Sequence, residues 1–302
     1  RKELLEKVKG KDAVLCLLND KIDEEVMKAA GKQCKIFSNY AVGYENIDVA
    51  AASKKKIFVT NTPDCLTNTT ADMAIGLLFA AARRIPEADK YCRDGKFKGW
   101  GPKLLLGKKI TGKKLGIIGA GRIGTNFALK MKMGFRMKIY YTDPYQNRML
   151  EDIARAKKVA LQELLEKCDF ISIHTNYNSK AHHLIGHKEF NLMKSNAVLV
   201  NTSRGKVVDE KELVKALREK KIFAAGLDVF EDEPKFAPGL TELDNVVLAP
   251  HLGSASDHAR NLMARMSAKS IIEAMEGKIP ECCLNRETFE KKRRKNVKSK
   301  KS

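Results

Sequence analysis

The sequence predicts an α/β protein with a doubly wound parallel sheet, and three observations carry that prediction. Short apolar runs alternate with helical segments over most of the 302 residues. One apolar run breaks into the turn G-x-G-x-x-G at Gly119, Gly121 and Gly124. A later run, 138–142, ends at Asp143, roughly 20 residues after that turn. The order of strand, glycine turn, helix, strand and acid is typical of a Rossmann-type dinucleotide-binding unit.

Each residue of this motif has a physical reason for its place. Gly119 permits the tight turn, Gly121 lets backbone N–H groups approach a pyrophosphate, and Gly124 lets the helix pack closely on the strand. The helix N-terminus then faces the anion with its partial positive charge. Asp143 would bind the ribose hydroxyls of NAD and repel the extra phosphate of NADP, although Arg148 nearby leaves NADP open. Glycines and aspartate also occur at such positions as ordinary turn residues.

Before the glycine turn, residues 1–62 predict a small parallel α/β layer, because short apolar strands alternate there with a helix. The strands are predicted at 13–18, 34–38 and 57–60, and the helix at 23–30. Thr69 and Asp72 then match a capping box. We expect this box to open a long helix that runs through Ala82 towards Lys90.

The same alternation continues beyond Asp143, so the larger sheet is predicted to hold six strands. Its later strands are predicted at 169–174, 197–201, 223–229 and 245–249. A final helix, 255–275, is expected to return to the first domain, because that domain is too short for a core of its own. The predicted organisation is a smaller discontinuous domain at 1–66 and 256–285, a dinucleotide-binding domain at 67–255, and a basic, disordered tail at 286–302.

Composition excludes several classes of protein. The net charge of +20 resembles a nucleic-acid footprint, but eight Lys and Arg without any acid lie in residues 291–302 alone. The other basic residues are dispersed without interleaved aromatics, so nucleic acid is not the favoured partner. The longest apolar stretch, 73–82, is half of the ~20 residues that a membrane span needs, which predicts a soluble protein. Seven cysteines without metal-ligand spacing predict reduced thiols in the cytoplasm and no metal site.

Three polar residues follow predicted strand ends, where ligands of parallel sheets bind: Arg204, Glu233 and His251. The planar fork of Arg204 can hold a carboxylate or a keto oxygen. His251 can exchange a proton near neutral pH, and an acid beside it would stabilise its imidazolium form. On spacing alone, Glu231 or Asp232 could serve as that acid as well as Glu233. Arg204 could instead be an ordinary surface arginine, and His251 a structural histidine.

Six phrases of the chain, in order, resemble the D-2-hydroxyacid dehydrogenase family. The match runs over nearly the whole chain, from about residue 3 to about 280, and six phrases in order make it highly specific. A seventh phrase, G-K-F-K-G-W, resembles the glyoxylate/hydroxypyruvate reductase branch of that family and ends at Trp100. The six phrases are V-G-Y-E-N-I-D at 42–48, T-N-T-P-D at 60–64, I-I-G-A-G-R-I-G at 117–124, N-T-S-R-G at 201–205, G-L-D-V-F at 226–230 and P-H-L-G-S at 250–254.

The resemblance implies an enzyme that uses NADH to reduce a small 2-keto acid, glyoxylate or hydroxypyruvate, to the D-2-hydroxy acid. Arg204 would hold the substrate, His251 would be the acid/base, and Glu233, the acid before a proline, would orient and charge His251. The backbone at Val42 and Gly43 would receive the substrate carboxylate.

The resemblance also implies the cofactor residues and the assembly. Asp228 would bond the nicotinamide carboxamide, and Trp100 would reach the neighbouring subunit of a homodimer. His174, His182 and His183 match structural positions. The full set implied for the cofactor is Gly119, Gly121, Arg122, Ile123, Gly124, Asp143, Thr202 and Asp228.

Two departures and two alternatives accompany the resemblance. The smaller domain would be flavodoxin-like but N-terminally truncated by about 35 residues, judged against the usual domain size. Asn176 stands where the family usually has proline, which puts the local loop shape in doubt. Transcriptional co-repressors of the same fold, which bind NAD without a metabolic role, are the alternative function. A formate dehydrogenase is less favoured, because glutamine would be expected at Glu233.

Overall fold

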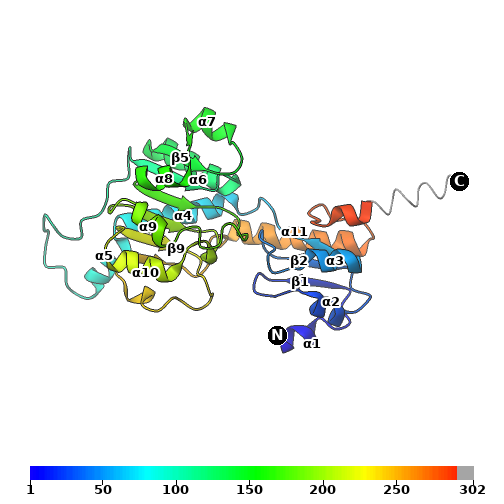
Figure 1. The fold of residues 1–302 in the computed structure, drawn as a ribbon. Helices are drawn as coiled ribbons and strands as arrows, with labels where there is room; N and C mark the ends of the chain where they lie inside the picture. Colours follow the sequence, from blue (N-terminus) through cyan, green and yellow to red (C-terminus); the bar gives the residue numbers. More distant parts are fainter. Residues whose placement is uncertain (291–302) are drawn as a thin grey trace. The chain divides into compact units, whose positions relative to one another are not determined.

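The computed structural model describes residues 1–290, and they group into two compact units (Figure 1). The smaller unit combines Arg1–Leu66 with the chain from Ala255 onward, and the larger unit is Thr67–Ser254. Both are built on parallel sheets flanked by helices, so the predicted α/β class with a Rossmann sheet is confirmed. Within the described residues, no helix has the length and apolar character needed to cross a membrane.

The larger unit contains a seven-stranded parallel sheet in the order β10-β9-β8-β7-β4-β5-β6. The order changes direction beside β4, which pairs with both β5 and β7, and ligands of doubly wound sheets bind at such a switch point. Six strands lie where the sequence predicts them, but β6 was missed because its two lysines carry no apolar pattern. The strands are β4 Lys114–Ile118, β5 Lys138–Thr142, β6 Lys157–Lys158, β7 Phe170–Ile173, β8 Val198–Asn201, β9 Ala224–Leu227 and β10 Val246–Leu248.

Helices cover both faces of this sheet, which explains why its central strands are apolar on both sides. One core packs the sheet against α4 (Thr67–Ala82), α6 (Arg122–Phe135) and α7 (Arg148–Ala154). The other core packs it against α8 (Leu161–Lys167), α9 (His187–Leu192) and α10 (Glu210–Arg218). Two short 3-10 helices, η1 (Gly205–Val207) and η2 (Leu240–Glu242), also belong to this unit.

The predicted capping box is wrong. Helix α4 begins at Thr67, so Thr69 and Asp72 lie inside its first two turns rather than at its start. The helix also ends at Ala82 instead of continuing towards Lys90. A second helix, α5 (Ile85–Arg93), follows after a left-handed residue and carries a proline near its start. Proline cannot donate the backbone bond that a continuous helix needs, so the chain restarts there.

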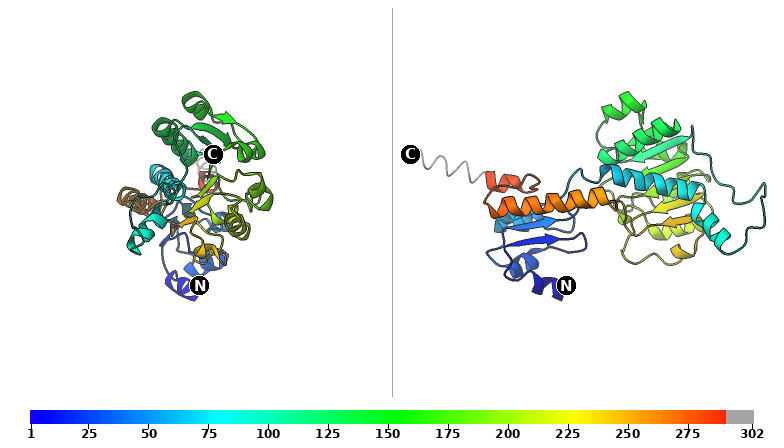
Figure 2. Two further views of the ribbon diagram at one scale, coloured as in Figure 1. Left: turned by 90° about the vertical axis from the view of Figure 1, so that its left-hand side faces the viewer. Right: turned by 180° about the vertical axis from the view of Figure 1, so that it is seen from behind.

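The smaller unit is a three-stranded parallel sheet in the order β1-β2-β3. Helix α11 packs against it, and Figure 2 shows that helix in orange alongside the blue strands. Two bonds fix it: the Ser38 hydroxyl donates to the Ser267 carbonyl at 3.3 Å, and the Tyr40 hydroxyl to the Arg260 carbonyl at 2.7 Å. The elements are α1 Lys2–Lys7, β1 Ala13–Cys16, α2 Glu24–Ala30, β2 Ile36–Asn39, α3 Val49–Lys55, β3 Phe58–Thr60 and α11 Asp257–Met275.

The chain after α11 is bound to the edge of β3. The buried side chain of Asn285 accepts from the Val59 N–H at 3.1 Å and donates to the Ile57 carbonyl at 2.8 Å. Phe289 stacks on Phe58 with ring centroids 3.9 Å apart. Residues 286–290 are therefore helical and packed, whereas the sequence predicted a disordered tail from residue 286. The rest of that predicted tail, 291–302, lies outside the described residues.

We predict that Asn285→Ala lowers the free energy of unfolding by about 2 kcal/mol or more, since a buried N–H and a buried carbonyl each lose their partner. Thermal unfolding followed by circular dichroism measures the effect. Glu290→Ala, at an exposed residue nearby, is the control and should change stability by less than about 0.5 kcal/mol. Equal melting of the two variants would contradict the assigned role of Asn285.

Candidate functional site

A histidine and a carboxylate meet at the carboxyl edge of the larger sheet. His251 follows β10, and Glu233 lies in the loop after β9. The Nδ1 atom of His251 is 2.9 Å from the Oε2 atom of Glu233. Glu231, the alternative left open by spacing, instead contacts His183 at 2.6 Å. The structure therefore pairs His251 with Glu233.

The surroundings of Glu233 favour its ionised form. Partial burial alone would raise the pKa of this carboxyl, but hydrogen bonds from His251 and from the Phe230 N–H, at 3.0 Å, outweigh that effect. The positive charge of Arg204 adds to it, and the pKa lies below its ordinary value. Both side chains of the pair stay about one-third exposed, at 32% for His251 and 36% for Glu233. The pair is thus an ionised carboxylate on the ring of a histidine, within reach of solvent or a ligand.

Asp228 holds the turn that carries His251. Its buried carboxylate accepts from the N–H groups of Leu252 and Gly253, both at 2.6 Å. The His251 N–H donates to the Asp228 carbonyl at 2.9 Å, and His251 itself has a left-handed φ of 56°. Burial raises the pKa of Asp228, although these two backbone bonds oppose the shift. The structure therefore gives Asp228 an orienting contact that the resemblance did not imply.

Arg204 projects from the turn after β8 and is half-buried. Its Nη1 atom donates to the Ser203 carbonyl at 2.7 Å, and the Asn201 side chain donates to the Arg204 carbonyl at 3.0 Å. The next residue, Gly205, has no room for a side chain, since a Cβ there would lie 1.9 Å from the carbonyl carbon and oxygen of Phe230. The Arg204 turn therefore abuts the backbone just before Glu233.

The predicted glycine turn connects β4 to α6. Gly119 has a left-handed φ of 92°, and a Cβ there would lie 2.6 Å from the Thr175 nitrogen. A Cβ at Gly124 would lie 2.1 Å from the Gly119 oxygen. At Gly121, the residue preceding α6, a Cβ would meet no heavy atom of the described chain within 4 Å. The turn is thus tightly packed underneath but open where the helix N-terminus begins, which fits the pyrophosphate of a dinucleotide.

The other residues implied for the cofactor lie along the same edge. Arg122 and Ile123 open α6. Asp143 accepts backbone bonds at 2.8 Å from residues 120 and 145, so it is tied to the glycine turn. The buried hydroxyl of Thr202, after β8, has no hydrogen-bond partner among the described residues. A polar atom left without a partner in this position suits a bound ligand.

Val42 and Gly43 belong to the smaller unit, after β2. The Asn61 side chain donates to the Val42 carbonyl at 2.7 Å, and the Asn39 side chain donates to the Gly43 carbonyl at 2.8 Å. The turn is therefore rigidly anchored through its carbonyl groups.

No group of three or more metal-ligating side chains occurs among residues 1–290, and the seven cysteines within them are free.

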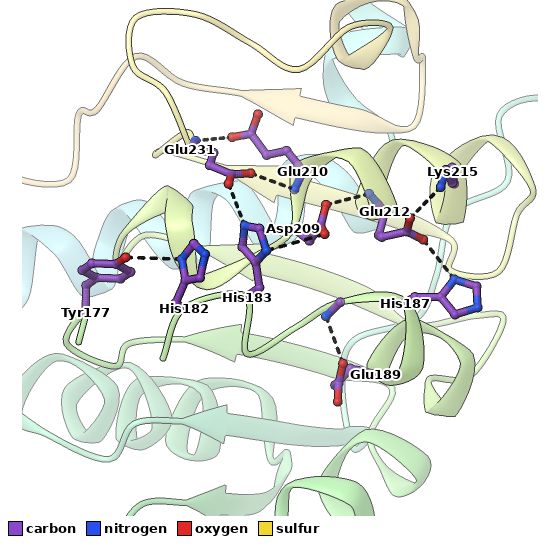
Figure 3. A network of polar contacts seen from close by, with 11 residues as sticks. Tyr177, His182, His183, His187, Glu189, Asp209, Glu210, Glu212, Lys215 and Glu231 are labelled. Atoms are coloured by element: carbon purple, nitrogen blue, oxygen red, sulfur yellow. Dashed lines mark hydrogen bonds and ion pairs between the residues drawn. The ribbon is translucent and has the colours of Figure 1, made fainter. Parts of the chain in front are cut away.

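Sequence reasoning missed a polar network behind this site, shown in Figure 3. Its centre is Glu210, a carboxylate that is only 3% exposed at the start of α10. His183, which the resemblance matched to a structural position, also belongs to it through Glu231. A glutamate in the first turn of a helix is common on helix-dipole grounds alone. The sequence therefore carried no signal that this one is buried.

Comparisons with known proteins agree with this architecture. Residues 75–253 match the family described as "D-isomer specific 2-hydroxyacid dehydrogenase, NAD binding domain". The chain is 49% identical to a glyoxylate reductase of Thermococcus litoralis, over 95% of this chain and 87% of that protein. It is 50% identical to a glyoxylate reductase of Korarchaeum cryptofilum, over 95% and 86%.

A solved structure agrees as well. The crystal structure of a glyoxylate reductase from Paecilomyes thermophila superposes with a TM-score of 0.83 at 34% identity, covering 94% of this chain and 88% of that one. These matches give no support to the co-repressor alternative. The chain belongs to the D-isomer-specific 2-hydroxyacid dehydrogenase family.

Proposed function

We propose that this chain reduces glyoxylate to glycolate, or hydroxypyruvate to its D-2-hydroxy acid, with a nicotinamide dinucleotide as cofactor. The observation that carries the proposal is the contact of His251 with Glu233 at 2.9 Å, on the same sheet edge as the glycine turn. Membership of a dehydrogenase family, and glyoxylate reductases among its relatives, support the 2-keto acid as substrate class.

Each side chain has a defined task in this reaction. A bound NADH supplies the hydride. The guanidinium of Arg204 binds the carboxylate and polarises the keto group of the substrate. Because Nδ1 of His251 contacts Glu233, its Nε2 atom is the one that donates a proton to the keto oxygen. Glu233 stabilises the imidazolium before the transfer and holds the ring in the same orientation after it.

The proposed cofactor is NAD rather than NADP. Both carboxylate oxygens of Asp143 accept backbone bonds at 2.8 Å beside the glycine turn. A negative charge fixed there binds ribose hydroxyls and repels an additional phosphate. Thr202 would bond the cofactor through its buried hydroxyl, and Asp228 would do so in addition to its backbone contacts.

The proposed substrate domain is the smaller unit. Its turn at Val42 and Gly43 would receive the substrate carboxylate through backbone N–H groups, because side-chain amides already occupy the two carbonyls. The larger unit would be the NAD-binding domain. The predicted cytoplasmic location remains a prediction.

A spectrophotometric assay of the full chain tests the function. We expect NADH absorbance at 340 nm to fall with glyoxylate or hydroxypyruvate, and less with pyruvate or with NADPH. His251→Ala should reduce turnover by about 10²–10⁴-fold, the usual contribution of a general acid, while NADH affinity stays unchanged. His187→Ala, at an exposed histidine on α9, is the matched control. No oxidation of either nucleotide by the wild-type chain with any of these acids would overturn the proposal.

The pH dependence of the reaction tests the role of Glu233. Its lowered pKa keeps the carboxyl ionised across the neutral range, where its charge stabilises the His251 imidazolium. Glu233→Gln removes that charge, so His251 should lose its proton at lower pH. Reduction needs the protonated ring, and the alkaline limb of the kcat profile should therefore move to lower pH. An unchanged limb in this variant would assign proton donation to another group.

A homodimer is part of the proposal and has its own test. In the loop after α5, cyan in Figure 1, Trp100 is 86% exposed and Phe97 is 57% exposed. Large apolar side chains that are this exposed in a single chain are typical of residues that a partner subunit covers. We expect the double variant Trp100→Ser/Phe97→Ser to sediment as a monomer where the wild type sediments as a dimer. Met133→Ser, at a residue of α6 that is 76% exposed, should leave the dimer intact. A dimer that persists in the double variant places the interface elsewhere.

A further inference from the structure

The loop that carries Glu233 is held at both of its ends by one buried side chain. We call residues 230–237 the acidic loop. The N–H of Glu231, at its start, donates to Oε1 of Glu210 at 2.5 Å. The N–H of Ala237, at its end, donates to Oε2 of the same carboxylate at 3.1 Å. Glu233 therefore lies on a segment whose two ends are fixed to the first turn of α10. Figure 3 shows the contact at the Glu231 end.

A second contact ties the same loop to a different part of the unit. Nε2 of His183 is 2.6 Å from Oε1 of Glu231, and its Nδ1 is 3.6 Å from a carboxylate oxygen of Asp209. Asp209 is the N-cap of α10, and the His183 N–H donates to the Lys206 carbonyl at 2.9 Å. His183 thus links three parts of the unit. Its imidazole contacts the acidic loop and the start of α10, as Figure 3 shows, and its backbone N–H binds the turn that follows Arg204.

Close backbone packing also prevents the acidic loop from moving towards Arg204. The backbone at Gly205 packs so closely on Phe230 that even a methyl group would overlap its carbonyl. The Phe230 N–H donates to the Glu233 carboxylate at 3.0 Å. Any shift of the loop would therefore change the place of the Glu233 carboxylate relative to both Arg204 and His251.

Burying Glu210 is costly, which indicates that its carboxylate has a specific task. Desolvation raises the pKa of this carboxyl, and the charges of Glu231 and Asp232 add to the rise. The two backbone bonds only partly oppose it. An apolar side chain could fill the same volume without that penalty, but it could not accept from two N–H groups at once. A carboxylate is the side chain that accepts both bonds with its two oxygens.

We propose that Glu210 is a positioning residue that, together with His183, holds the acidic loop so that the Glu233 carboxylate stays on Nδ1 of His251. The inference rests on the proposed function, because it assigns these residues an effect on proton donation. The titratable and charged groups that interact with Glu233 are His251, Arg204 and Asp228, and those that interact with His251 are Glu233 and Asp228. If the acidic loop loosens, Glu233 moves away from His251, whereas Asp228 stays beside it.

The main variant is Glu210→Gln, which keeps the volume but replaces one acceptor oxygen with an N–H₂ group facing a loop N–H. We expect kcat to fall by about tenfold or more, as a small misplacement does, with KM nearly unchanged. The alkaline limb of the pH profile should move to lower pH. NADH affinity, which depends on the glycine turn, should stay within about twofold. Glu212→Gln, on the same helix but paired with Lys215 and His187, is the matched control.

The double variant Glu210→Gln/Glu233→Gln shows whether Glu210 acts through Glu233. If it does, the shift of the alkaline limb should equal that of Glu233→Gln alone. A neutral side chain at position 233 has no charge to place beside His251, so the hold of Glu210 on the loop no longer matters. Shifts that add would overturn the proposal. A wild-type pH profile and kcat in Glu210→Gln would do the same.

Two further measurements separate this inference from folding and from the proposed function. His183→Gln alters a side chain that is 35% exposed, so the fold should tolerate it, and it should shift the limb in the same direction by a smaller amount. Nuclear magnetic resonance of ¹⁵N-histidine follows His251 without turnover. In Glu210→Gln, His251 should lose its proton at lower pH than in the wild type. Identical titration would overturn the inference, whereas an inactive wild type with the expected titration would overturn only the proposed function.

Discussion

Two buried carboxylates that accept backbone N–H bonds determine the geometry on which the site depends. Asp228 holds the turn of His251, and Glu210 holds the loop of Glu233. Each carboxylate lies where burial opposes its charge, so each is retained against an electrostatic cost. Loops at a sheet edge lack the ladder that orders strands, and a bidentate acceptor replaces it. The partly exposed pair of His251 and Glu233 is therefore ordered from behind, by carboxylates that bind backbone N–H groups.

Much of the site could be predicted because its signals are local. The glycine turn, Asp143 and the residues at strand ends follow from short patterns, and six strands of the larger sheet lie within one or two residues of their predicted ranges. The choice between Glu231 and Glu233 needed the family resemblance or the structure, since three acids within three residues are equivalent in sequence. Glu210 could not be found, because the N–H groups it binds lie 21 and 27 residues further on.

The fold predictions were wrong where local sequence preferences compete with tertiary packing. The spacing of Thr69 and Asp72 satisfies a capping rule, yet the helix begins earlier because its apolar residues pack on β8 and β9. Strand β6 exists only because its backbone pairs with β5, and its two lysines give no apolar signal. The segment 286–290 was assigned to a charged tail, but one aromatic contact, Phe289 on Phe58, places it on the sheet. In each case tertiary packing overrides a local pattern.

The bonds of Asn285 to the edge of β3 bear on the order in which the chain can fold as it is synthesised. The strands of the smaller unit leave the ribosome before the larger unit, but the helix and the asparagine that complete the smaller unit leave it afterwards. All of the larger unit, Thr67–Ser254, is synthesised in between. Since domains fold as units, the larger unit can close while the first 66 residues still wait for their partners. During that interval the strands β1–β3 lack the cover of α11, which makes the nascent chain most dependent on chaperones before α11 appears.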